Sequence, residues 1–78
     1  MTVIAYVLIQ TEVGRAEQVA SSARAIKGVV AADNVAGPYD VIVKAESSSL
    51  DDLGKLVVSE IQKVDGITRT FTCPIVNL

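Results

Sequence analysis

The chain repeats a pattern of glycines and apolar residues at an interval of 38 positions, about half of its 78 residues. Gly28-Val29 recurs as Gly66-Ile67, and a strand-like run precedes a helix-like segment in each half. Other matched pairs along the two halves are Val3 and Val41, Val19 and Val57, Ala23 and Ile61, and Ile26 and Val64. Each half therefore has the order strand, helix, strand, and together the halves predict a split βαββαβ fold.

Hydrophobic periodicity gives the expected bounds of each element. The strands are expected at 3–9, 29–36, 41–45 and 67–76, and the helices at 15–27 and 50–63. The right-handed crossover rule places the first and third strands side by side in the centre of the sheet. The predicted fold class is α+β: a ferredoxin-like sandwich with a four-stranded antiparallel sheet and two helices on one face. Residues 1–78 are expected to form one domain.

Capping residues support both helices. Thr11 is a candidate N-cap for the first helix, and Gly28 is expected to end it. A run of serines, 47–49, supplies the N-cap of the second helix. Asp51 and Asp52 follow in its first turn, where the helix dipole favours negative charge. Pro74, near the end of the last strand, suits an edge position or a strand end.

The sheet is expected to have an uncovered apolar face. Half of the residues are apolar, which exceeds what so small a two-layer domain can bury. The first strand is apolar on both faces, yet two helices can cover only one face of the sheet. Packing of the open sheet face against a second copy is the simplest remedy, so we expect at least a dimer.

Composition excludes several classes of function. The net charge is −2 and the pI is about 4.8, without a basic patch, which disfavours direct binding of nucleic acid. The longest apolar run, 3–9, has the length of a strand, so neither a membrane span nor a signal peptide is expected. The single cysteine, Cys73, fits a reducing cytoplasm and is interpreted as a small hydrophobic residue. The absence of histidine removes the common catalytic dyads and zinc sites, so no enzyme activity, metal or cofactor is expected.

The turn Gly37-Pro38-Tyr39-Asp40 is the candidate functional feature. Gly37 is free to take unusual backbone angles and Pro38 fixes its own φ, so the turn is well defined. Asp40 places a charge at the start of an apolar strand, where charges are uncommon without a partner. From these residues alone, a hairpin turn with a solvent-facing Asp40 and a ligand-binding turn remain equally open.

Three motifs in order resemble the effector-binding domain of the Lrp/AsnC (feast/famine) transcriptional regulators. They are Gly28-Val29, Gly37-Pro38-Tyr39-Asp40, and the segment Gly66-Ile67-Thr68-Arg69-Thr70-Phe71-Thr72. The resemblance covers essentially the whole chain. Members of that family carry an N-terminal helix-turn-helix, which is missing here, so the chain resembles a stand-alone form of the effector domain. The resemblance implies sheet-to-sheet dimers, which assemble further into octamers or similar rings.

The same resemblance implies that an amino acid or related metabolite binds in a cleft between dimers. The turn borders that cleft, with Asp40 as the candidate partner of the ligand ammonium and backbone N–H groups as partners of its carboxylate. Tyr39 would wall the site, and the hydroxyls of Thr70 and Thr72 are further candidates. The leading hypothesis is therefore a regulatory module without direct DNA binding, which is expected to associate with full-length Lrp/AsnC relatives.

Several alternatives remain open at this point. An ACT-like amino-acid-binding domain shares the βαββαβ order, and small ferredoxin-like dimeric enzymes share the fold. A purely structural oligomer would use the turn only to join two strands. The threonines at 68, 70 and 72 are also explained by β-propensity alone, and Arg69 by a surface or inter-subunit ion pair.

Overall fold

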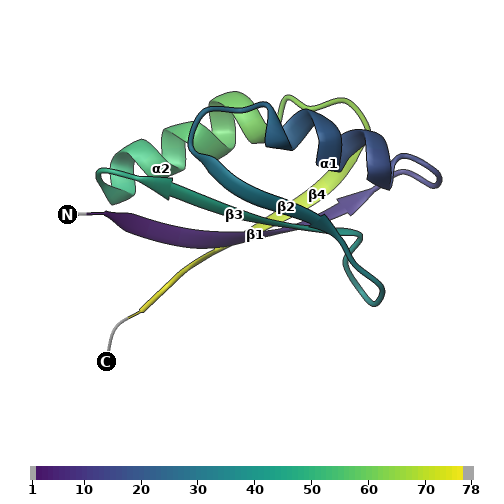
Figure 1. Cartoon of the computed structure of the whole chain (residues 1–78), viewed down its shortest axis with the longest axis horizontal. Coiled ribbons are helices and arrows are strands. Elements are labelled where there is room, and N and C mark those ends of the chain that lie inside the picture. Colours follow the sequence, from purple (N-terminus) through teal and green to yellow (C-terminus); the bar gives the residue numbers. More distant parts are fainter. Residues whose placement is uncertain (1, 77–78) are drawn as a thin grey trace.

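Four antiparallel strands form one sheet in the order β2-β3-β1-β4, and both helices lie over the same face of it (Figure 1). A computed structural model describes residues 2–76. The elements are β1 (Val3–Thr11), α1 (Ala16–Arg24), β2 (Val29–Asn34), β3 (Val41–Ser47), α2 (Leu50–Leu56), a π-helical turn η1 (Val57–Ile61) and β4 (Ile67–Pro74). The predicted α+β class, the helix layer on one face and the central position of the first and third strands are confirmed.

The core lies between the sheet and the helices. Alternate residues of β1 and β3 face the helices because side chains of a strand alternate between its two faces. In β1 the buried residues are Ala5, Val7 and Ile9, and in β3 every second residue from Val41 to Ala45 is buried. The helix layer contributes Val19, Ala20, Ala23, Leu53, Val57 and Ile61.

The two glycines of the repeat have the same conformation and the same packing role. Gly28 and Gly66 have φ values of +100° and +99°, in the left-handed region that favours glycine. A Cβ on Gly28 would lie 2.9 Å from Leu56 Cδ2, and a Cβ on Gly66 would lie 3.2 Å from Val19 Cγ2. The glycine that follows each helix thus lets the other helix approach closely, and this explains why both halves carry one.

Several predicted bounds are wrong in detail. The first helix ends at Arg24, three residues early, and β2 ends at Asn34 instead of residue 36. Thr11 does not cap α1: it is the last residue of β1, and the N-cap position belongs to Arg15, whose side chain makes no capping bond. The reason is that β1 pairs with β4 as far as Thr11, opposite Ile67, so the strand occupies the residue expected to begin the turn.

The second helix changes its hydrogen-bonding pattern halfway. It begins as predicted, with the Ser49 hydroxyl accepting from the Asp52 N–H at 3.1 Å. After Leu56 the turn widens, and the Gln62 N–H donates to the Val57 carbonyl five residues back at 2.9 Å.

β4 ends at Pro74, short of the predicted residue 76, and lies at the sheet edge as its proline suggests.

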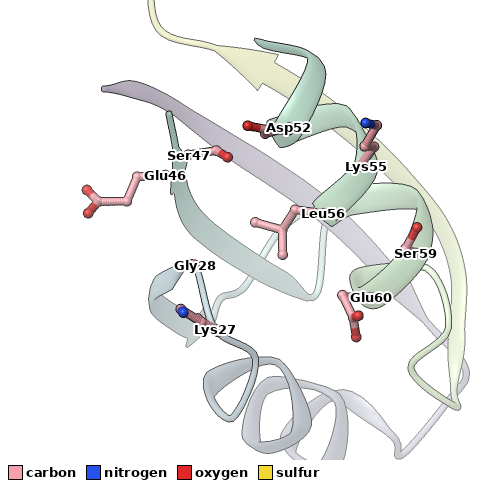
Figure 2. A pocket seen from close by; sticks show the side chains of 9 residues that line it. All are labelled: Lys27, Gly28, Glu46, Ser47, Asp52, Lys55, Leu56, Ser59 and Glu60. Carbon is pink, nitrogen blue, oxygen red and sulfur yellow. The ribbon is translucent and has the colours of Figure 1, made fainter. Parts of the chain in front are cut away.

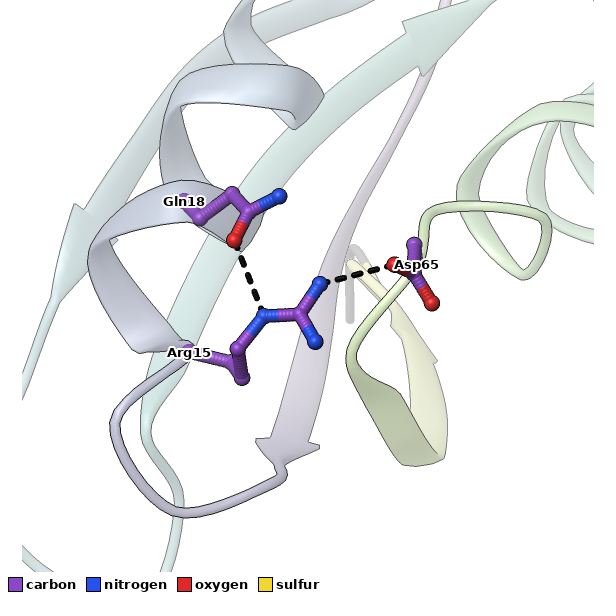
Figure 3. Close-up of polar contacts among 3 residues, drawn as sticks. All are labelled: Arg15, Gln18 and Asp65. Carbon is purple, nitrogen blue, oxygen red and sulfur yellow. Dashed lines mark hydrogen bonds and ion pairs between the residues drawn. The ribbon is translucent and has the colours of Figure 1, made fainter.

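Arg15 connects the start of α1 to the loop before β4 (Figure 3). Its guanidinium donates to Asp65 Oδ2 at 2.8 Å and, through Nε, to Gln18 Oε1 at 2.9 Å. This hydrogen bond and the charge of Arg15 lower the pKa of the Asp65 carboxyl below its usual range. The same pair raises the pKa of Arg15.

The Arg15–Asp65 pair should make a small, pH-dependent contribution to stability. Because the pKa of Asp65 is lower in the folded state, the contribution is present above the unfolded-state pKa of about 4 and is lost as pH falls through the folded-state pKa. Urea unfolding at pH 7 should give a slightly lower midpoint for Asp65→Asn than for the wild type. The two midpoints should converge in strongly acidic buffer, and a difference that persists there would contradict this assignment.

Candidate functional site

The Gly37–Asp40 turn joins β2 to β3 and is held at its base by Asp40. The Asp40 N–H donates to the Ile9 carbonyl at 2.9 Å, and its own carbonyl accepts from the Val35 N–H at 3.0 Å. Its carboxylate Oδ2 accepts from the Thr11 N–H at 2.8 Å and from the Thr11 hydroxyl at 3.3 Å. Asp40 is therefore half-buried and fixed to the end of β1, instead of facing solvent freely.

The exposed part of the turn offers hydrogen-bond donors. Gly37 has φ +128°, and an added Cβ would meet no atom within 4 Å. Within residues 2–76, the N–H groups of Gly37 and Tyr39 donate to no protein acceptor. The Pro38 carbonyl accepts from Gln10 Nε2 at 3.1 Å, which ties the turn to β1 a second time. The turn thus contains N–H groups without a protein acceptor within residues 2–76, and it ends at a fixed carboxylate.

Tyr39 folds onto the open face of the sheet. Its ring packs edge-to-face against Phe71, with ring centroids 5.8 Å apart. The guanidinium carbon of Arg69 lies 4.8 Å from the centroid of the same Phe71 ring, on the same strand. These three side chains form a small cluster that links the turn to β4, and within residues 2–76 Arg69 makes this cation–π contact and no ion pair.

Thr70 and Thr72 lie on the opposite face from this cluster. In β4 they pair with Ile9 and Val7, which are buried against the helices, whereas Phe71 pairs with Leu8 on the open face. The Thr70 hydroxyl accepts from Gln62 Nε2 at 3.0 Å. Within one chain, the structure therefore does not bring Thr70 and Thr72 together with the Gly37–Asp40 turn.

A shallow hollow lies beside Thr70. It has a volume of about 290 Å³ and lies between β4 and the end of η1. Its lining is mainly polar, and the residues are Gln62, Ile67, Thr68, Arg69 and Thr70. We call it the Thr70 hollow. It is open to solvent and offers hydroxyl and amide groups.

Sequence reasoning missed three residues of these sites. Phe71 lies between Thr70 and Thr72 in the sequence. Because side chains alternate between the two faces of a strand, this position alone would have placed Phe71 on the face opposite the threonines, where it contacts Tyr39 of the turn. Gln10 and Gln62 contact Pro38 and Thr70 across 28 and 8 positions of sequence. No local pattern singles out either glutamine, because each contact depends on the packed fold.

The open face of the sheet is apolar at its centre. Leu8 in β1 lies opposite Ile42 of β3 and Phe71 of β4, and Ile4 and Tyr6 lie on the same face. Tyr6 and Phe71 are 41% and 37% exposed. No helix in the described part of the chain covers this face, and none is long and apolar enough to cross a membrane. The exposed patch is thus suited to contact with another protein surface.

Comparison with known proteins identifies the relatives of this chain. The family model of the Lrp/AsnC ligand binding domain matches residues 4–77. An uncharacterized HTH-type transcriptional regulator of Pyrococcus furiosus is 34% identical over 65 residues, which cover 83% of this chain and 39% of that protein. The chain therefore spans about two-fifths of the length of this curated relative.

Solved structures with the same fold include proteins both of similar length and longer. A hypothetical protein from Pyrococcus horikoshii is 32% identical, with a TM-score of 0.88, over 100% of this chain and 93% of that one. A transcriptional regulator of Neisseria meningitidis, solved as a complex with L-Met, has a TM-score of 0.83 at 14% identity. That match covers 96% of this chain and 50% of the regulator.

Proposed function

This chain belongs to the Lrp/AsnC family, and on that premise we propose that it is a regulatory module that binds an amino acid or a related small metabolite. The observation that carries the proposal is the geometry of the Gly37–Asp40 turn. The same short turn holds a carboxylate fixed by Thr11 and N–H groups that donate to no acceptor within residues 2–76. An anion and free N–H donors on one short turn match the ammonium and carboxylate of a free amino acid.

The chemistry of a distant relative supports the ligand class. The Neisseria meningitidis regulator with this fold was solved with L-Met. In our proposal the ligand ammonium contacts the Asp40 carboxylate, and the ligand carboxylate accepts from the N–H groups of Gly37 and Tyr39. Pro38 shapes the turn, and the Tyr39 ring forms one wall.

We place the complete site between copies of the chain. Thr70, Thr72 and the turn lie on different faces of one protomer, so a ligand can contact all of them only if two protomers contribute. The Thr70 hollow of one protomer then receives the Gly37–Asp40 turn of another. The threonine hydroxyls and the Gln62 amide add polar partners to those of the turn.

The apolar open face supports a dimer. Ile4, Tyr6, Leu8, Ile42 and Phe71 form a patch that a second copy buries by packing sheet against sheet. At about 25 cal/mol per Å² of buried apolar surface, an interface of ordinary size stabilises such a dimer strongly. Dimers whose Gly37–Asp40 turns dock into the Thr70 hollows of neighbouring dimers then assemble into rings such as octamers.

The module is proposed to act through protein partners. With a net charge of −2 it lacks the electrostatic character of a DNA-binding surface. Full-length Lrp/AsnC regulators present the same kind of domain, so mixed assemblies with them provide a route to transcriptional control in the cytoplasm. No catalytic role is proposed for any residue.

Asp40→Asn should weaken amino-acid binding while the fold stays intact. The asparagine oxygen can still accept from the Thr11 N–H, but the charge that attracts the ligand ammonium is removed. Loss of one charge-assisted hydrogen bond should weaken affinity about tenfold or more. Titration calorimetry with L-methionine, followed by the other common amino acids, measures the change.

Thr11→Val is the matched control for the same contact. It removes the hydroxyl that bonds Asp40 at 3.3 Å but leaves the carboxylate charge in place. Its affinity should stay within about threefold of the wild type, because its backbone N–H still holds Asp40. Equal affinities of Asp40→Asn and the wild type would refute the role of Asp40.

A further inference from the structure

A second hollow lies at the far end of β3 from the Gly37–Asp40 turn (Figure 2). The turn precedes Val41, whereas this hollow borders Glu46 and Ser47 at the other end of the strand. Its volume is about 400 Å³, within the range of roughly 300–1,000 Å³ that small-molecule sites occupy. We call it the Leu56 hollow, because Figure 2 shows the Leu56 side chain at its centre.

The floor of the Leu56 hollow is apolar. Leu56 is half-buried, and Gly28 lies directly beside it without a side chain. A Cβ at Gly28 would lie 2.9 Å from Leu56 Cδ2 and 3.3 Å from the Glu46 carbonyl oxygen. The glycine therefore keeps this floor open, and the Glu46 N–H to Gly28 carbonyl bond of 2.8 Å fixes its edge.

The rim carries charges of both signs that do not pair with one another. Two lysines and three carboxylates line the hollow: Lys27, Lys55, Glu46, Asp52 and Glu60. Within residues 2–76, the Arg15–Asp65 contact is the only ion pair within 4.0 Å, and neither partner belongs to this hollow. Positive and negative groups thus remain available, at separate positions, to a ligand that carries both.

The internal repeat provides a comparison for the charged residue that precedes Gly28. Lys27, just before Gly28, corresponds to Asp65, just before Gly66. Asp65 is bound by Arg15, and the side chain of Arg15 comes within 3.2 Å of where a Gly66 Cβ would be. Arg15 thus pairs with Asp65 beside Gly66, whereas Lys27, beside Gly28, makes no ion pair in the part of the chain that the structure describes.

The π-helical turn contributes to the same wall. Ser59 and Glu60 line the hollow from η1, and Lys55 and Leu56 line it from the end of α2. Single π-helical turns are uncommon within helices and are frequently found at functional sites. Here the widened turn adds a hydroxyl and a carboxylate to the rim opposite Lys27 (Figure 2).

We propose that the Leu56 hollow is a second binding site, for a small zwitterion with an aliphatic side chain. A free aliphatic α-amino acid is the simplest such ligand. Its carboxylate contacts a rim lysine, its ammonium contacts a rim carboxylate, and its side chain packs on Leu56. All of these groups come from one protomer, so the site does not depend on the assembly or on the turn site proposed above.

Methyl NMR of the oligomeric protein can test this site separately from the turn site. The leucine and isoleucine methyl groups are labelled, and L-leucine is titrated as the probe. Leu56 reports on the hollow, Ile67 reports on the Thr70 hollow, and Leu53, which is 1% exposed, serves as a core reference. We expect saturable shifts at Leu56 that persist in the Asp40→Asn variant.

Charge variants test whether the rim lysines of the Leu56 hollow bind the ligand. The double variant Lys27→Gln/Lys55→Gln should weaken the Leu56 response about tenfold, and the exposed control Lys63→Gln should change it less than about twofold. The 2-oxo acid analogue of leucine, 4-methyl-2-oxopentanoate, lacks the ammonium and should bind more weakly than L-leucine. Shifts confined to Ile67 would overturn this site while supporting the turn site. An unshifted Leu56 at saturating L-leucine, or equal responses in wild type and double variant, would also overturn it.

Discussion

Replacing Leu8 with aspartate should convert the protein from a dimer or larger assembly into a monomer. Leu8 lies at the centre of the apolar patch on the open face, opposite Ile42 and Phe71. In the proposed dimer an aspartate here would be buried on a face whose nearest side chains are apolar, with Lys44 only diagonally across from it on β3. The cost should be about 3 kcal/mol or more, which weakens association more than a hundredfold. Sedimentation velocity at micromolar concentration measures the mass directly.

Leu50→Asp is the matched control, because it makes the same chemical change on the helix side. Leu50 is 60% exposed and is the first residue of α2, where the helix dipole tolerates a negative charge. This variant should keep the mass of the wild type. Far-UV circular dichroism of both variants separates dissociation from unfolding. A Leu8→Asp protein that is folded and still fully assembled would contradict the sheet-to-sheet dimer.

Replacing Gly28 with alanine should strongly destabilise the fold. The residue has φ +100°, and the new Cβ would lie 2.9 Å from Leu56 Cδ2 and 3.3 Å from a backbone carbonyl oxygen of β3. The backbone strain and the contact together should cost about 2–3 kcal/mol in the free energy of unfolding. Urea denaturation measures this value through the shift of the midpoint.

Gly14→Ala separates the two parts of this cost. Gly14 has φ +80°, and a Cβ there would meet nothing within 4 Å, so its substitution carries the backbone strain alone, about 1 kcal/mol. The double variant Gly28→Ala/Leu56→Ala should lose less than the sum of the two single changes, because the clash is relieved. Equal costs for Gly28→Ala and Gly14→Ala would show that close packing at Gly28 contributes nothing.

The fold was largely predictable because its signals are local or repeated. Runs of apolar residues identified the first and third strands, the recurring glycines at 28 and 66 marked the two βαβ halves, and the crossover rule placed these two strands in the centre. The Ser49 cap was also predicted correctly, because capping depends on neighbours in sequence. The role of Thr11 was predicted wrongly, because its partners, Asp40 and Ile67, are brought to it only by the packed sheet.

The candidate site was less accessible to sequence reasoning. The turn could be identified as unusual, but the fixing of Asp40 by Thr11 and the contact of Tyr39 with Phe71 join positions 29 and 32 residues apart. The separation of Thr70 from the turn follows from strand alternation combined with the pairing register. The Leu56 hollow has no linear signature, because its lining comes from four segments of the chain.

The central claim is that the ligand site is completed by two protomers, and subunit mixing tests it most directly. Asp40→Asn weakens ligand binding by the turn of a protomer, and Thr70→Val removes a hydroxyl from its Thr70 hollow. The two variants are denatured and refolded together, and L-methionine binding is measured by calorimetry. In a 1:1 mixture half of the turns and half of the hollows are wild type, so random assortment should restore wild-type affinity at about a quarter of the sites. Neither variant alone forms a site of wild-type affinity. A mixture that binds no better than its separate components would contradict the claim.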